Sequence, residues 1–185
     1  MYAFDPSTVQ LAGDAAKPIE PLFYIINHED DKERVFDDIV DFMIEKRGFS
    51  SSNIIQTLTS IYDGAQTAAD VVDIANRGGY VLVFWSQHVL PDDQWMGAAD
   101  VDGWPHFLFR RRALGAYGLL MEMGLERDRY IIAQLDASEV QPIFDGNLHV
   151  KLYDHDGLSW ENNIDGLIVK LYWLMYQDKR LPAVP

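Results

Sequence analysis

The chain has 185 residues, of which 48% are hydrophobic and 12% aromatic, a composition typical of one globular domain with a sizeable core. It contains no cysteine, which excludes disulfides, thiolate nucleophiles and cysteine-based zinc sites. The formal net charge of −14 argues against nucleic acid and against an anionic membrane surface as partners. A small anionic ligand needs only a local basic patch and stays compatible with this charge.

The two ends of the chain differ from its middle. Residues 1–20 are polar and contain proline, which predicts a loosely ordered amino-terminal arm. This segment lacks the pattern of a signal peptide, and no stretch of the chain is long and apolar enough to span a bilayer. We therefore expect a cytoplasmic protein with one domain over residues 21–178 and a short tail over residues 179–185.

Short apolar runs alternate with helical patterns through the whole domain. The runs predict strands over residues 22–26, 54–58, 80–85, 130–135 and 148–152. Apolar residues at helical spacing predict the helices between them, which end near Gly48, Gly78 and Gly124, and a last helix over residues 160–176. This alternation predicts an α/β fold with a five-stranded parallel sheet, helices on both faces and the flavodoxin-like strand order 2-1-3-4-5.

In such a sheet, ligands bind beyond the carboxyl ends of the strands. This rule selects residues 27–31, 59–64, 86–105, 136–139 and 153–157. The third segment is unusually long for a compact domain. It contains Trp95 and Trp104, which can stack on a base, and it leads into residues 110–112, three arginines that can hold a phosphate near a helix start. Alternatively, the tryptophans only pin the loop, and the arginines lie on a solvated face, which is the preferred interpretation for the arginines.

Several familiar site motifs are absent from the sequence. The five histidines do not show the spacing of metal ligands on one helix, so no metal site is expected. There is no GxGxxG fingerprint, Walker loop or GxSxG elbow. Rossmann cofactor binding, P-loop hydrolysis and α/β-hydrolase chemistry therefore lack support.

The order of these segments resembles that of TIR domains. The run Ser86-Gln87-His88-Val89-Leu90 followed by Trp95 is similar to the Ser-x-x-x-Leu…Trp run after their third strand. The later part resembles the bacterial TIR-like predicted nucleotide-binding proteins, over residues 110–118, the turn 124–129 before the fourth strand, and the segment 142–146 before the fifth. The resemblance covers about residues 22–173, and its motifs are degenerate.

The resemblance implies a ligand and a site. Enzymatic TIR domains cleave the nicotinamide–ribose bond of NAD with a glutamate on the helix after the long loop, because a carboxylate can stabilise the oxocarbenium character of the ribose. The aligned position is Ala116 in one alignment and Ala99 in the other. Asp100, beside Ala99, and Glu122, further along the helix, are the remaining catalytic candidates. The residues expected to bind NAD or a related nucleotide are Asn27, His28, Asp30, Gly64, Ser86, Trp95, Trp104, Arg111 and Arg112.

Three functions stay open. The first is a hydrolase that cleaves the N-glycosidic bond of NAD or another nucleotide, with the nucleoside deoxyribosyltransferases as a close variant. The second is a non-catalytic TIR-like signalling module that binds a nucleotide or assembles into a homo-oligomer, and the missing glutamate favours it. The third is an interaction domain whose acidic surface suits a basic partner.

Overall fold

The computed structural model describes residues 22–56, 64–89, 104–124, 127–154 and 159–177. The strands are β1 (Phe23–Ile26), β2 (Ile54–Gln56), β3 (Tyr80–Trp85), β4 (Tyr130–Gln134) and β5 (Leu148–Lys151). The helices are α1 (Asp41–Arg47), α2 (Gly64–Arg77), α4 (Trp104–Glu122) and α5 (Trp160–Gln177). Shorter helical segments are η2 (Glu29–Asp31), η3 (Arg34–Val40), η4 (Ser51–Asn53), η6 (Arg127–Arg129) and η7 (Pro142–Phe144).

All the strand pairs are parallel, and the strand order is β2-β1-β3-β4-β5. The predicted α/β class with a parallel sheet and packed helices is therefore confirmed, and the order is the one expected from the alternating pattern. A parallel sheet requires a crossover between successive strands. The first three crossovers contain α1, α2 and α4, whereas the connection from β4 to β5 contains only the short segment η7. Because the strands are parallel, every strand ends at the same edge of the sheet, which we call the carboxyl edge.

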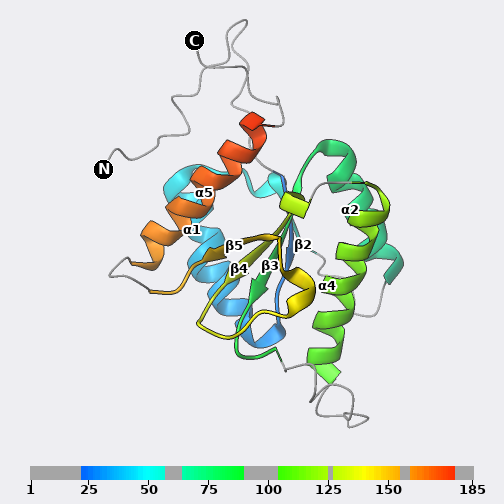
Figure 1. The fold of residues 1–185 in the computed structure, drawn as a ribbon. Helices are drawn as coiled ribbons and strands as arrows, with labels where there is room; N and C mark the ends of the chain where they lie inside the picture. Colours follow the sequence, from blue (N-terminus) through cyan, green and yellow to red (C-terminus); the bar gives the residue numbers. More distant parts are fainter. Residues whose placement is uncertain (1–21, 57–63, 90–103, 125–126, 155–158, 178–185) are drawn as a thin grey trace, which may run out of the picture.

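Helices lie on both faces of the sheet (Figure 1). Side chains from the central strands fill a separate core on each face. Phe23 and Ile25 point into a core with η3, α1 and α5, whereas Tyr24 and Ile26 point into a core with α2 and α4. Strands covered on both faces lack polar positions, which explains why β1 and β3 appear in the sequence as continuous apolar runs. Hydrophobic burial on both faces therefore stabilises the sheet.

The first helix ends where the glycine predicts. Gly48 adopts a left-handed conformation with φ of +73°, and its backbone N–H donates to the carbonyl oxygen of Ile44. The N–H of Phe49 then donates to the carbonyl of Met43, so two carbonyl groups at the helix end are satisfied. The turn directs Phe49 back into the core beneath β1.

A bidentate ion pair joins α1 to α5 on one face of the sheet. Arg47 donates from Nε and Nη2 to the two carboxylate oxygens of Asp165, at 2.5 and 2.7 Å. The hydrogen bond to Asp165 is the main reason why the pKa of Arg47 is raised. The guanidinium also lies over the ring of Phe42, 4.6 Å from its centroid. This contact holds the two helices together at the surface of their shared core.

Some expectations lie outside the described residues. These are the amino-terminal arm, the carboxyl-terminal tail, the last two residues of the predicted second strand, and most of the long loop after β3. Within the described part of the chain, no helix combines the length and apolarity needed to cross a bilayer.

Gly79 precedes β3 at a point of close packing. A Cβ atom there would lie 2.6 Å from the carbonyl oxygen of Leu22 and 2.8 Å from a methyl carbon of Ile74. We expect Gly79→Ala to lower the free energy of unfolding by about 1–3 kcal/mol, because the backbone of Leu22, just before β1, and the side chain of Ile74 in α2 must move away from the added methyl group. Denaturant titration checks this value.

The matched control is Gly166→Ala in α5, where an added Cβ meets nothing within 4 Å. This substitution should leave stability unchanged or raise it by up to about 1 kcal/mol, because alanine has the higher helix propensity. Equal effects of the two substitutions would show that the packing around Gly79 is not limiting.

Candidate functional site

The candidate site lies at the carboxyl edge between β1 and β3. In the sheet, β1 has β2 on one side and β3 on the other, so the chain reverses its direction of winding between these two neighbours. Ligands of open α/β sheets bind at such a switch in strand order. Two turns flank it, one over residues 27–31 after β1 and one over residues 86–89 after β3.

The turn after β1 is organised by His28. Its backbone is extended, and its Nδ1 accepts a hydrogen bond of 3.2 Å from the N–H of Asp30, which caps the short helix η2. The carbonyl of His28 accepts from the backbone N–H of Asp31 and from the side-chain amide of Asn27. These contacts hold the imidazole of His28 in a buried position, at 1% exposure, while Asp30 stays in solvent.

Asp31 connects the two turns. Its side chain is 4% exposed, and a buried carboxylate is costly unless it is hydrogen-bonded. Ser86 donates from Oγ to Oδ2 at 2.5 Å, and Nδ1 of His88 lies 2.9 Å from Oδ1. Each oxygen of the Asp31 carboxylate therefore has a partner from the turn after β3, and the two strand ends are held together.

Ser86 also shapes its own turn. Its Oγ accepts from the N–H of His88 at 3.1 Å, and its carbonyl accepts from the N–H of Val89. The imidazole of His88 is thereby directed toward Asp31, and 36% of its side chain is exposed. Serine is well suited to this position, because its hydroxyl can donate to one group and accept from another.

Ser86, His88 and Asp31 have the residue types of a nucleophilic triad but a different geometry. In a triad, one nitrogen of the histidine contacts the serine and the other contacts the carboxylate. Here Nδ1 of His88 is the nitrogen near both Asp31 and the hydroxyl of Ser86, which lies 3.3 Å away. The serine donates directly to the carboxylate and is 1% exposed. The arrangement suits orientation of His88 rather than attack by Ser86.

A second carboxylate joins the turn after β4 to the same edge. Asp136 accepts from the N–H of Gln87 at 2.8 Å and from the N–H of Ser138 at 2.9 Å. Burial alone raises the pKa of Asp136. The hydrogen bonds from Ser138 and Gln87 outweigh this effect, with help from the positive charge of Arg34, and the pKa is lowered below its ordinary value.

The structure brings together one part of the predicted ligand site. Asn27, His28 and Asp30 follow β1, and Ser86 follows the neighbouring β3. Gly64 and Trp104 are the first residues of α2 and α4, so their backbones lie at the start of helices that follow β2 and β3. Arg111 and Arg112 lie further along α4, and Trp95 and Asp100 lie outside the described residues.

Glu122, the catalytic candidate in α4, lies far from the start of the helix, and the aligned position Ala116 lies in the core. Glu122 is the last residue of the helix, at the end away from Trp104, and it is exposed. A helix of this length extends for about 28 Å, so the structure does not bring Glu122 to the carboxyl edge. Ala116, which aligns with the catalytic glutamate of TIR-like proteins, is buried in the core beneath the sheet.

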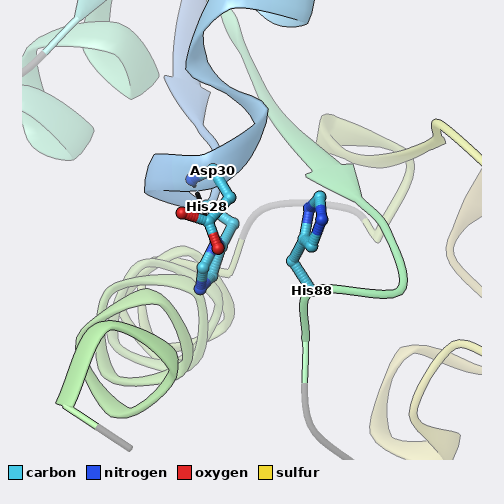
Figure 2. Close-up of side chains that lie close together, drawn as sticks. All are labelled: His28, Asp30 and His88. Atoms are coloured by element: carbon cyan, nitrogen blue, oxygen red, sulfur yellow. Dashed lines mark hydrogen bonds and ion pairs between the residues drawn. The ribbon is translucent and has the colours of Figure 1, made fainter. Parts of the chain in front are cut away.

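Sequence reasoning did not single out Asp31, His88 or Asp136. All three lie in segments that the carboxyl-edge rule selected, and that rule was the available signal. The histidine search failed because it tested spacing along one helix, whereas His28 and His88 come from different strand ends. Their ring centroids lie 5.8 Å apart, and Figure 2 shows them on facing turns.

The lowered pKa of Asp136 predicts a pH dependence. The folded state binds the proton more weakly than the unfolded state, so this carboxylate stabilises the fold above its unfolded pKa, and the contribution is lost as the pH falls through the folded pKa. We expect Asp136→Asn to cost about 1 kcal/mol at neutral pH, because two hydrogen bonds lose a charged acceptor. The difference from the unsubstituted protein should shrink toward zero in acid.

Chemical denaturation at a series of pH values measures this difference. Asp38→Asn changes the same charge at an exposed position of η3 and serves as the control. A stability difference for Asp136→Asn that stays constant from neutral pH into acid would contradict the assignment.

Comparisons of the chain with family models, with curated proteins and with solved structures found no match. The parallel α/β architecture and the side-chain geometry at the carboxyl edge are therefore the observations on which a function can be argued.

Proposed function

We propose that the carboxyl edge between β1 and β3 binds NAD or a related nucleotide, as a TIR-like domain would. The observation that carries the proposal is the polar cluster of His28, Asp31, Ser86 and His88 at the switch in strand order. Ligand sites on this architecture occupy the same position.

The chemistry of the edge suits the sugar part of a nucleotide. Asp30 has a carboxylate that is 65% exposed, and the partly exposed imidazole of His88 is held in place by Asp31. Carboxylates accept hydrogen bonds from ribose hydroxyls, as acidic residues do in dinucleotide-binding folds. Asp30 and His88 are the groups that we assign to the ribose.

The helix ends at this edge suit the phosphates. Both α2, which starts at Gly64, and α4, which starts at Trp104, follow strands of a parallel sheet, so their amino termini lie at the carboxyl edge. Free N–H groups and the helix dipole favour anions at such ends. Arg111 and Arg112 in α4 add positive charge to a strongly acidic chain.

Binding without turnover is the form of this function that the structure favours. The resemblance to TIR-like proteins places their catalytic glutamate at Ala116, which is 1% exposed and packs in the core. No carboxylate can act on a ribose from this position. A non-catalytic signalling module therefore fits better than an N-glycoside hydrolase or a deoxyribosyltransferase, and the experiment below separates them.

The test is a thermal melt of the full chain with NAD, ADP-ribose and ATP in the presence of EDTA. Saturating ligand should raise the melting temperature by roughly 5–10 °C, because ligand at 100 times its Kd adds about 2.7 kcal/mol to stability. Asp30→Asn should weaken binding by about tenfold through loss of a charged acceptor. Asp38→Asn should bind as tightly as the unsubstituted chain.

Incubation with NAD and measurement of free nicotinamide distinguishes binding from cleavage. We expect no release above the rate without protein. Release of nicotinamide would establish an enzyme and return attention to Asp100. Absence of any thermal shift with all three compounds would remove the nucleotide proposal altogether.

A further inference from the structure

Two histidines and an aspartate meet at the carboxyl edge in the manner of metal ligands. One ring nitrogen each of His28 and His88 and one carboxylate oxygen of Asp30 lie within 4.8 Å of one another. Figure 2 shows Asp30 beside His28 on the turn after β1, with His88 opposite on the turn after β3. The geometry points to a divalent transition-metal site formed by His28, Asp30 and His88.

His88 is held as metal-bound histidines are held. Such a histidine has one ring nitrogen on the ion and the other on a carboxylate, which fixes the orientation of the ring. Nδ1 of His88 lies 2.9 Å from Oδ1 of Asp31, and the other oxygen of that carboxylate accepts from Ser86. Nε2 of His88 is the nitrogen that this arrangement leaves for an ion.

His28 presents a lone pair toward Asp30. Its Nδ1 accepts from the backbone N–H of Asp30, so this nitrogen is unprotonated, and it lies 3.7 Å from Oδ2 of the same residue. Neutral imidazole is the form that binds metals. A cation bound between Nδ1 of His28 and Oδ2 of Asp30 accepts the lone pair of Nδ1, and the backbone N–H of Asp30 then loses this hydrogen bond.

The distances need little change to fit an ion. Zinc–nitrogen and zinc–oxygen bonds are about 2.0–2.2 Å long, so ligand atoms around one ion lie about 3–4 Å apart. His28 is buried and fixed by η2, whereas Asp30 is 65% exposed and His88 is 36% exposed. The two more exposed side chains can therefore move onto an ion that His28 anchors.

The ligand types indicate which metals fit. Two imidazoles and one carboxylate favour zinc and neighbouring first-row ions over magnesium and calcium, which prefer sites made of oxygen atoms. The buried anion of Asp31 adds negative charge behind the site. Three protein ligands leave at least one coordination position for water or another molecule.

The inference does not rest on nucleotide binding, and its experiment uses metal alone. The full chain is treated with EDTA, desalted, and titrated with Zn²⁺ by calorimetry in a non-chelating buffer. We expect one ion per chain, with Asp30→Asn and His88→Gln each raising the Kd at least tenfold. Asp31→Asn should raise it about 10–100-fold by releasing His88.

Two controls keep the result specific. Asp38→Asn removes an exposed carboxylate of η3, and His149→Gln removes a half-buried histidine of β5 that contacts the carbonyl of Phe144. Both variants should bind Zn²⁺ as the unsubstituted chain does. Thermal melts in EDTA establish that each variant is folded, and Asp30→Asn, at an exposed position, keeps the test decisive if His88→Gln unfolds.

Co²⁺ in place of Zn²⁺ gives an independent measurement through its visible absorption, which reports nitrogen ligands and low coordination number. The bands should disappear in His88→Gln and persist in His149→Gln. Absence of Zn²⁺ binding by the unsubstituted chain would overturn the inference. Binding of equal strength in Asp30→Asn and His88→Gln would overturn it as well, because the ion would then sit elsewhere.

Discussion

Coverage of the sheet on both faces is the constraint from which the rest of this structure follows. Phe23 and Ile25 pack against one layer of helices, and Tyr24 and Ile26 pack against the other, so β1, like β3, is buried along its whole length and carries no charged or amide side chain. Along these two strands, charged and amide side chains appear only where the strand stops. The positions that follow β1 and β3 therefore collect the chemically active residues, and the buried carboxylate of Asp31 is the point at which they meet.

This constraint also decides what the sequence could reveal. The apolar runs predicted the strands, because a buried parallel strand has few other compositions, and Gly48 marked a helix end through its left-handed backbone. The same pattern predicted the carboxyl edge of the sheet as the ligand site. It also placed four of the proposed ligand residues there, namely Asn27, His28, Asp30 and Ser86. It did not predict the pairing of His28 with His88, because this pairing depends on the register of β1 and β3 rather than on local spacing.

Part of the resemblance to TIR-like proteins has a structural explanation. Arg129 donates to the carbonyl of Gly78 and lies over the ring of Tyr80, so it fastens the start of β4 beside β3. Arg127 donates to the carbonyl of Asp145 in the segment before β5. These contacts give both arginines a role in stabilising connections of the parallel sheet.

The two edges of the sheet leave the protein with very different freedom to change. At Gly79 the start of β3 touches Leu22 and Ile74 so closely that a single methyl group does not fit. The opposite edge ends in turns whose outer residues, such as Gln87 and Asp30, face solvent. An engineer could therefore exchange the outer residues of these turns and retain the scaffold, provided that the buried contacts of Asp31 are kept, whereas any side chain larger than hydrogen at Gly79 would force its neighbours to move.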